Sequence, residues 1–524
     1  MSSPSLARVP TRRNTELVLL LVAVLVLFLL QVSIELALLS EITQTAFVLT
    51  AIIAVGLGAA HILVRVFAPY ADPILLPCAG LITGIGILFI RRLDMSAFVY
   101  EDGMRVPNYP TEADRAAMSV FADAGGRQLM YMIAAVLAFG AILWLIRDHR
   151  NLSRYPFIIG LVGVLTAASP VVFGSTINGS RLWINLGFIS IQPSEFAKLL
   201  LLIFFAYYLV RKREVLSLAS RKILGMHFPR GRDLIPVLVV WAISVLILIG
   251  IRDLGTSLLF FGMFVAMLYI ATERTSWIII GLSLFVGGVV LIYPFFDHLQ
   301  LRVAIWLDPF SDPLNDGRQL VQSLIGLGSG GLFGTGPGAG QPQETAPAAN
   351  SDFILSGLGE ELGLFGLAAI LMLYLLLVAR GMRAGLGVRD SFGKLLAGGL
   401  AFCVGFQLFV VLGGVSKLIP LTGQTAPYLA AGGSSLLANW VLLALLIRVS
   451  DAARRPKAAP IGPIKIAPPP PPADNSPTQI VTIAPELREL DIPPSNEETA
   501  LISTENPDAE PDGESPATTP EVKP

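Results

Sequence analysis

Apolar runs separated by short polar connections fill most of the chain up to about residue 450. Crossing the hydrocarbon core of a bilayer, which is about 30 Å thick, takes roughly 20 apolar residues of α-helix. Twelve runs approach this length, near residues 16–39, 45–64, 73–90, 128–146, 156–173, 195–210, 235–251, 256–271, 276–293, 361–380, 395–416 and 434–449. The pattern therefore predicts an all-α polytopic membrane protein with about 12 transmembrane helices.

The first apolar run begins like a secretory signal, because Arg8, Arg12 and Arg13 precede it. An ordinary signal core has about 7–15 apolar residues and ends at a cleavage site of small residues. The run at 16–39 is longer and lacks such a site. We therefore expect residues 1–15 to form a cytoplasmic N-terminus and the run to remain as a membrane anchor.

Basic residues favour one side of the predicted helices. If the N-terminus is cytoplasmic, the connections near 147–154, 211–232, 380–394 and 448–455 lie on the same side, and they carry more Lys and Arg than the opposite connections. Positive residues are retained on the cytoplasmic side of membrane proteins. Both termini are therefore predicted to be cytoplasmic.

Composition supports this interpretation and excludes several other classes. Of the 524 residues, 54% are hydrophobic and only 14% are charged, whereas a soluble domain carries about 25% charged residues. The net charge of -1 argues against a nucleic-acid partner. Four histidines and two cysteines leave little for zinc, haem or disulfide chemistry.

Three segments interrupt the apolar pattern. Residues 93–127 form a polar connector, and residues 294–356 form a large extracytoplasmic loop that contains an amphipathic helical pattern at 319–327. A loop this long is usually functional or disordered, and its helical pattern and aromatic residues argue against disorder. Residues 450–524 are Pro-rich and then acidic, which predicts a disordered cytoplasmic tail. We therefore expect an active site to face the outside.

Several common enzyme motifs are missing from the sequence. The glycine run at 328–336 lacks the Gly-Lys-Ser/Thr ending of a phosphate-binding P-loop. The sequence has no G-x-S-x-G elbow, and none of its histidines has a plausible nucleophile beside it. A nucleotide site and triad hydrolysis are both disfavoured.

Carboxylates and cations of the large loop are the first candidates for chemistry. Asp308, Asp312 and Asp316 recur at intervals of four residues, and the first two precede proline. Asp before Pro is a common helix N-cap, so a purely structural role stays open for each. The same stretch holds polar side chains suited to binding an anionic substrate, namely Arg302, Arg318, Gln322 and Ser323.

A second candidate cluster opens the apolar run at 195–210. Glu195 and Lys198 are three residues apart and therefore share one face of a helix. A lone charge at the bilayer centre costs about 2.5–3.5 kcal/mol on insertion scales, so the pair is predicted to face the bundle interior or a water-filled cavity. Arg181 lies in an interfacial segment before it, and Asp253 is open to either a capping or another hydrogen-bonding role.

Together these segments resemble the SEDS family (shape, elongation, division and sporulation). The resemblance is specific, because the motifs match in order and spacing over residues 73–449. They are Gly179-Ser180-Arg181 with Trp183-Ile184, Gln192-Pro193-Ser194-Glu195-Phe196-Ala197-Lys198, Asp253-Leu254-Gly255-Thr256, Asp308-Pro309-Phe310-Ser311-Asp312-Pro313, Gln322-Ser323, Gly328-Ser329-Gly330-Gly331, Asp352-Phe353-Ile354 and Gly359-Glu360-Glu361-Leu362-Gly363.

The resemblance implies a peptidoglycan glycosyltransferase with a core of ten helices. Such enzymes polymerise lipid II, the undecaprenyl-diphosphate-linked disaccharide-pentapeptide, at the outer face of the bacterial cytoplasmic membrane. They act with a class B penicillin-binding protein as transpeptidase. The family's essential aspartate corresponds to Asp312, and its important Glu and Lys correspond to Glu195 and Lys198. The two predicted helices within 16–72 are then an added N-terminal pair, as in RodA proteins of actinobacteria.

Other positions refine this resemblance. Leu-Asp-Pro at 307–309 is similar to the elongation branch, RodA, rather than to the division branch, FtsW. Arg252 stands where the family usually has Pro, and Ala430-Ala431 stand where it has Ser-Tyr. Polar contacts of those Ser and Tyr hydroxyls are therefore not expected in this chain.

The chemistry implied is transfer of a glycan from a lipid diphosphate to an acceptor hydroxyl. One general base suffices, because a diphosphate leaves without a proton when cations or a metal screen its charge. We expect Asp312 to accept the proton, Glu195 to orient Lys198 or help bind a divalent cation such as Mg or Mn, and glycines 328–331 to allow close packing against substrate. Lys198 would hold the diphosphate together with Arg181, Arg302 and Arg318.

Other functions stay open at this stage. A lipid II flippase or transporter, a scaffold that recruits a synthase, and a division-specific paralogue would all suit a multi-helix membrane protein. Transporters often contain paired repeats around a midplane site, whereas this sequence shows no internal repeat and its polar motifs gather at one face. Polymerisation of lipid II, and its dependence on Asp312, distinguishes an enzyme from a transporter and a scaffold.

Overall fold

The computed structural model describes most of the chain up to residue 456. The described residues are 11–96, 98–101, 104–107, 120–121, 123–177, 180–185, 187, 190–218, 221–223, 226–228, 235, 238–240, 242–243, 246, 253–345 and 347–456. Most of the predicted helix at 235–251, Arg252, and the predicted tail beyond residue 456 lie outside them.

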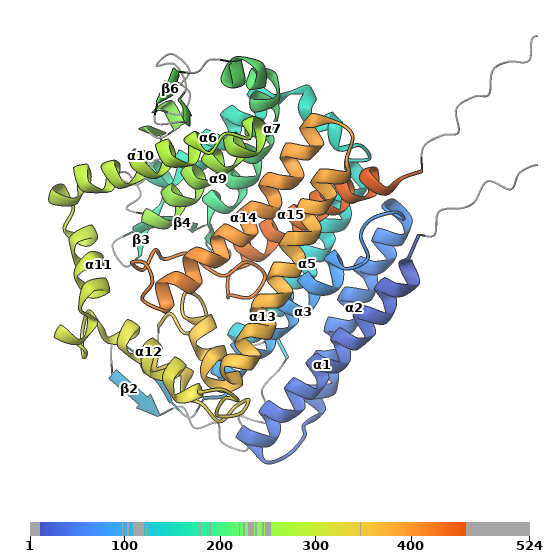
Figure 1. Cartoon of the computed structure of the whole chain (residues 1–524). Coiled ribbons are helices and arrows are strands. Elements are labelled where there is room, and N and C mark those ends of the chain that lie inside the picture. Colours follow the sequence, from blue (N-terminus) through green and yellow to red (C-terminus); the bar gives the residue numbers. More distant parts are fainter. Residues whose placement is uncertain are drawn as a thin grey trace, which may run out of the picture. The chain divides into compact units, whose positions relative to one another are not determined.

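Eleven helices in the described part are long and apolar enough to cross a membrane. They confirm a multi-pass, mainly α-helical membrane protein (Figure 1). Their bounds are α1 (Arg13–Leu39), α2 (Gln44–Phe67), α3 (Leu75–Asp94), α5 (Ala124–Leu145), α6 (Pro156–Phe173), α7 (Pro193–Leu218), α9 (Leu254–Thr272), α10 (Ser276–Ile292), α13 (Ile354–Gly387), α14 (Ser391–Val415) and α15 (Gly433–Arg454).

Short hairpins, rather than further helices, occupy several connections. β1 (Phe98–Glu101) pairs with β2 (Met104–Pro107), and β6 (Arg221–Ile223) pairs with β7 (Met226–Phe228). Before α7, β4 (Ser180–Asn185) lies between β3 (Ser175–Ile177) and β5 (Ser190–Ile191), with both pairs antiparallel. The all-α prediction therefore holds for the membrane helices but missed these connecting strands.

Burial differs strongly among the membrane helices. In the most apolar stretch of α3, 94% of the residues are buried, against 17% in α10. A helix that is apolar all round is either surrounded by protein or exposed to lipid. Composition does not separate these two cases, so the central place of α3 is a property of the tertiary structure.

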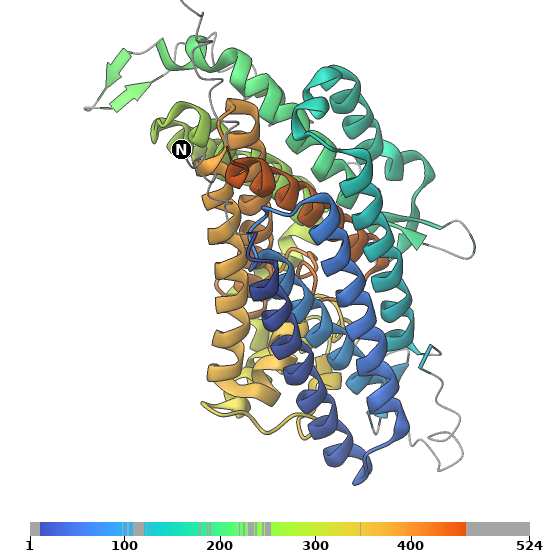
Figure 2. The ribbon, with the colours of Figure 1, turned by 90° about the vertical axis from the view of Figure 1, so that its right-hand side faces the viewer.

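The predicted additional N-terminal helices are present as α1 and α2. They run side by side and pack on α3 and α5 (Figure 2). Buried charges join them, because the guanidinium of Arg13 lies 2.5 Å from a carboxylate oxygen of Glu16, and the other oxygen of Glu16 lies 2.8 Å from Nδ1 of His61. Arg13 also donates to the carbonyl of Ala71, just before α3.

The predicted large outer loop is largely helical. It contains α11 (Asp297–Leu307), the 3-10 turn η3 (Pro309–Ser311), α12 (Arg318–Gly330) and a second 3-10 turn, η4 (Pro342–Thr345). The amphipathic pattern at 319–327 is thus confirmed as part of α12. At the end of this loop, α13 starts at Ile354, within the range predicted as loop. α15 continues to Arg454, beyond residue 450, where the tail is predicted to begin.

The glycine run after α12 packs closely against α13. A Cβ on Gly334, whose φ is +83°, would lie 2.2 Å from the carbonyl oxygen of Glu361. The side chain of Glu361 accepts from the backbone N–H of Gly338 at 3.0 Å and lies 2.5 Å from Nε of Arg92. Small residues and one buried ion pair therefore fasten this part of the loop to α3 and α13.

The helix core also depends on a close approach at Gly86. A Cβ at this position of α3 would lie 2.1 Å from the carbonyl oxygen of Leu429, in the connection between α14 and α15. Gly86→Ala should therefore lower the free energy of unfolding by about 1–3 kcal/mol through overpacking, seen as a lower Tm in detergent. Gly58→Ala is the matched control, because no atom lies within 4 Å of its added Cβ. An unchanged Tm in Gly86→Ala would contradict this packing argument.

Candidate active site

A buried ion pair lies at the start of α7. Pro193 begins this helix, and Glu195 and Lys198 follow on one face. The ammonium of Lys198 donates to Glu195 Oε2 at 2.6 Å. It also donates to two amide oxygens, Oε1 of Gln407 at 3.0 Å and Oδ1 of Asn439 at 3.3 Å. Because an ammonium has three donors, every donor of this fully buried side chain has an acceptor.

Gln407 and Asn439 were not identified from the sequence. They lie on α14 and α15, each within a long apolar run, and both are almost completely buried. A polar residue inside a membrane helix is costly unless it has a partner, which makes it a functional candidate. This signal was available in the sequence, but only the fold shows that both amides meet Lys198.

The connection between α14 and α15 continues this polar network. Nε2 of Gln407 donates to the carbonyl of Thr425 at 2.9 Å. The hydroxyl of Thr425 donates to Oγ of Ser435 at 3.2 Å, and Asn439 donates to the carbonyl of Ser435 at 2.8 Å. The α14–α15 connection, residues 416–432, is therefore held directly by the groups that surround Lys198.

A second charged group lies along the same connection. Nη1 of Arg302, on α11, donates to the carbonyl of Leu421 at 2.7 Å. Gly423 has a φ of +75°, and a Cβ there would lie 3.5 Å from Arg302 Nη2 and 4.0 Å from Asp352 Oδ2. Burial raises the pKa of Asp352 to about 6, while the positive charge of Arg302 acts in the opposite direction. Arg302 and Asp352 therefore face one another across a glycine.

Asp253 lies close to the same connection and caps a helix. Its carboxylate accepts from the backbone N–H of Thr256 at 3.1 Å at the start of α9, which confirms the capping role left open by the sequence. The amide of Gln424 reaches the Thr256 hydroxyl at 3.4 Å. Asp253 also belongs to the electrostatic surroundings of Asp352 and raises its pKa.

Asp312 lies in a partly exposed turn between η3 and α12. Its carboxylate accepts from Nδ2 of Asn315 at 2.9 Å and lies 3.5 Å from the backbone N–H of Asp316. Asp308, in contrast, caps η3 through the N–H of Phe310 at 3.2 Å. The two aspartates that precede proline therefore differ, since Asp308 is a cap and Asp312 is held by a turn.

The other predicted site residues have diverse surroundings. Ser323 is fully buried on α12 and donates to the carbonyl of Val415 at 3.0 Å, so its hydroxyl joins α12 to the end of α14. Gln322 and Arg318 are half-buried on α12, and Arg181 is exposed on β4. Trp306 of α11 donates to the carbonyl of Lys417 at 3.1 Å. The large loop is thus attached at several points to the α14–α15 connection.

Direct contact between the two predicted clusters is not observed. In the described part of the chain, no hydrogen bond or ion pair joins Asp312 to Glu195 or Lys198. Their connection runs through α11 and the α14–α15 connection. The two predicted clusters therefore do not form a single hydrogen-bonded cluster.

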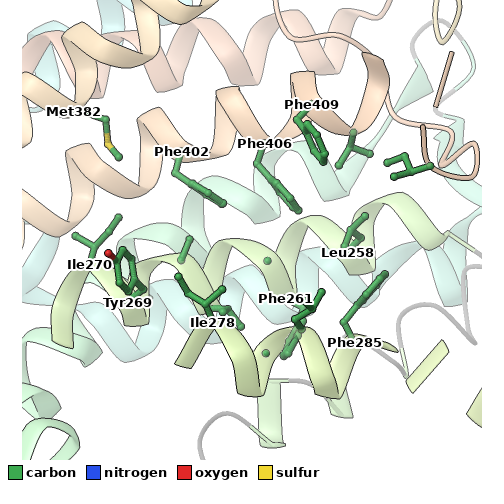
Figure 3. A pocket seen from close by; sticks show the side chains of 17 residues that line it. Leu258, Phe261, Tyr269, Ile270, Ile278, Phe285, Met382, Phe402, Phe406 and Phe409 are labelled. Carbon is green, nitrogen blue, oxygen red and sulfur yellow. The ribbon is translucent and has the colours of Figure 1, made fainter. Parts of the chain in front are cut away.

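An apolar groove of about 600 Å³ begins close to this region (Figure 3). It lies between α9, α10 and α14, and Phe261, Phe402 and Phe406 project into it. Leu258, near the start of α9, and Ile419 of the α14–α15 connection line one part of the groove. Tyr269, near the other end of α9, lines its distant part. Ligand sites commonly combine such an apolar cavity with a few polar groups.

No cluster of three His, Cys, Asp or Glu side chains suited to a metal is found among the described residues. The turn between η3 and α12 contains two acidic side chains, Asp312 and Asp316. Since Mg²⁺ is often held by one or two carboxylates together with substrate phosphates, this donor set fits a cation shared with a substrate. It does not fit a metal cage made by the protein alone.

Comparisons with known proteins agree with this architecture. A peptidoglycan glycosyltransferase RodA of Mycobacterium tuberculosis is 45% identical over 85% of this chain and 92% of its own length. A probable peptidoglycan glycosyltransferase FtsW of Geobacter metallireducens is 35% identical over 61% of this chain and 83% of its own. A solved chain of a peptidoglycan synthase complex aligns with a TM-score of 0.54 and 26% identity, covering 72% of this chain and 97% of that chain. The model of the FtsW/RodA/SpoVE family, described as cell cycle protein, matches residues 110–455, and the chain belongs to this family.

Proposed function

We propose that this chain, a peptidoglycan glycosyltransferase of the RodA type, polymerises lipid II at the outer face of the bacterial cytoplasmic membrane during cell elongation. The observation that carries the proposal is a charged, hydrogen-bonded region placed beside a long apolar groove. A polyprenyl-diphosphate sugar has the same division into a charged part and a long apolar part. The higher identity to the RodA relative than to the FtsW relative favours elongation over division.

The groove suits the first part of the polyprenyl chain. Leu258 and Ile270 mark its extent along α9, and the twelve residue steps between them span about 18 Å of helix. Leu282 is 63% exposed and Phe409 is 49% exposed, so the groove is open along one side. A long lipid can therefore enter sideways and leave the rest of its chain in the bilayer.

Arg302 is the best-placed cation for the diphosphate. One of its nitrogens is fixed by the carbonyl of Leu421, and the other end of its guanidinium faces Gly423 and Asp352. A guanidinium fixed in this way presents paired donors to phosphate oxygens without a further loss of side-chain freedom. Arg318, at the start of α12, would add charge on the side of Asp312.

Asp312 is proposed as the general base. A base needs an accessible carboxylate oxygen within hydrogen-bond reach of the acceptor hydroxyl. The side chain of Asp312 is only half-buried, and its neighbours Asn315 and Asp316 fix it by donated hydrogen bonds.

The sequence predicts Lys198 as a ligand of the diphosphate, but its surroundings suit a positioning role better. Its three donors already have acceptors, and one of them, Gln407, holds the carbonyl of Thr425. We propose that Glu195 and Lys198 position the α14–α15 connection, and through it Arg302. Direct contact between Lys198 and the diphosphate would require exchange of one of the present acceptors.

The neighbouring solved chain comes from a peptidoglycan synthase complex for polymerization and crosslinking. This likeness supports a class B penicillin-binding protein as partner of the present chain. The positive-inside pattern supports cytoplasmic termini, and with cytoplasmic termini Asp312 would lie on the outer side, where we propose that the glycan strand is made. Assays of polymerisation should therefore include the transpeptidase partner.

Asp312→Ala should abolish polymerisation of purified lipid II while leaving the fold intact. Loss of a general base typically lowers the rate about 10²–10⁴-fold. Polymer is measured on gels with the full chain and its partner, and Asp297→Asn serves as the matched control because it removes an exposed carboxylate of the same loop. Normal polymer length and rate in Asp312→Ala would refute the assignment.

Lys198→Ala should lower both stability and activity, because it leaves Glu195 buried without its partner. Breaking a buried ion pair costs about 3–5 kcal/mol. The double variant Glu195→Gln/Lys198→Met removes both charges at similar volume and should recover most of the lost Tm. If the pair positions Arg302 for substrate, the double variant keeps a raised KM for lipid II, whereas full recovery of activity would show that the pair serves folding alone.

A divalent cation bound with the diphosphate would help to screen the leaving charge, with Asp316 as its protein ligand. Removal of divalent ions with EDTA should then stop polymerisation, and added Mg²⁺ or Mn²⁺ should restore it. Asp316→Asn should raise the Mg²⁺ concentration needed for half-maximal rate. Undiminished polymerisation in EDTA would exclude this role.

A further inference from the structure

A basic pocket of about 240 Å³ lies where α15 ends. It is formed by the segment around the 3-10 turn η1 (His149–Arg154), the turn before α14, and the last part of α15. Its charged lining consists of five arginines and two aspartates, namely Arg147, Arg150, Arg389, Arg448, Arg455, Asp148 and Asp451. α15 begins at the α14–α15 connection, so this pocket is separated from the proposed active site by the length of the helix.

The two aspartates of the basic pocket already accept hydrogen bonds. Asp451 accepts from the backbone N–H of Tyr70 at 2.8 Å and from Nη2 of Arg455 at 2.7 Å. Asp148 accepts from the N–H of Arg150 at 2.9 Å. In contrast, Arg147 and Arg389 form no ion pair with a carboxylate in the described part of the chain. The pocket therefore holds more positive charge than its own acids balance.

Arg448 forms a fixed, buried part of the lining of this pocket. Its side chain is 3% exposed, and its two terminal nitrogens donate to the carbonyls of Phe67, at 2.6 Å, and Leu143. Its Nε is buried and has no hydrogen-bond partner within the described residues. Arg448 therefore ties the end of α15 to the ends of α2 and α5 and fixes one wall of the basic pocket.

The size and donors of the pocket indicate the class of ligand. Sites for drug-sized molecules occupy about 300–1,000 Å³, so a pocket of about 240 Å³ suits a small group. Guanidinium groups match phosphate oxygens in charge and geometry. We propose that this basic pocket binds a phosphate ester anion, supplied either by the head group of an anionic phospholipid or by a free phosphate compound.

The surroundings make the phospholipid source accessible. Trp144 and Tyr155, which flank the pocket residues in sequence, are each 56% exposed. Exposed Trp and Tyr typically lie at the membrane–water interface, and basic pockets between membrane helices bind anionic head groups. The acyl chains would then follow the exposed apolar faces of α5 and α6, where Leu145 and Phe157 are each 64% exposed.

Binding can be measured on the purified full chain by its thermal unfolding. One arm uses nanodiscs of phosphatidylcholine with and without phosphatidylglycerol, and a second arm adds inorganic phosphate to phosphatidylcholine nanodiscs. A ligand that binds only the folded chain raises Tm by mass action. The pocket variant is Arg147→Gln/Arg389→Gln, whose exposed side chains do not hold the fold. The control is Arg65→Gln/Arg383→Gln, which removes two exposed charges close to the ends of α2 and α13, outside the pocket.

We expect the pocket variant to bind about tenfold more weakly, which corresponds to about 1.4 kcal/mol, and the control variant to bind like the wild type. A Tm rise with phosphatidylglycerol alone assigns the site to a lipid head group, and a rise with inorganic phosphate assigns it to a free phosphate compound. The proposal is overturned if neither probe raises Tm, or if the pocket and control variants lose the shift equally. Polymerisation in phosphatidylcholine does not depend on either result, so the proposed function is tested separately.

Discussion

Burial of the Glu195–Lys198 pair is the constraint on which the rest of the described site depends. A charge surrounded by lipid and protein is stable only when it is paired and hydrogen-bonded. Lys198 meets this requirement through Glu195 on its own helix and through amides on α14 and α15. The hydrogen bonds of one buried charge therefore join three membrane helices, α7, α14 and α15.

The α14–α15 connection links the buried pair to the other polar groups of the site. It receives a hydrogen bond from Gln407 on one side and from Arg302 on the other. Glycine at position 423 leaves room for Arg302 and Asp352 to approach, and Gly86 allows Leu429 to pack against α3. Polar and steric contacts from several helices thus hold this segment, which has no regular secondary structure. Ile419 of this connection also lines the apolar groove, as the proposed binding of one lipid-linked substrate to both requires.

The loop at 294–356 shows how residues that look alike in sequence can differ in structure. Asp308 and Asp312 both precede proline, yet Asp308 caps η3 and Asp312 accepts hydrogen bonds within a turn. Ser323 belongs to a shared motif, but its buried hydroxyl joins α12 to α14. Local sequence cannot separate these roles, because each depends on which backbone groups lie nearby after folding.

The sequence by itself determined the membrane class, most of the helices, the added N-terminal pair and the family, since these follow from apolar length and from ordered motifs. It also identified Glu195, Lys198 and Asp312 as candidates, because charge is scarce in such a chain. Only the tertiary structure showed Gln407 and Asn439 beside Lys198 and Asp352 beside Arg302, and only it placed α3 at the centre and α10 at the surface. The physical reason is that apolar patterns report burial in either lipid or protein, whereas the partners of a buried polar group come from helices distant in sequence.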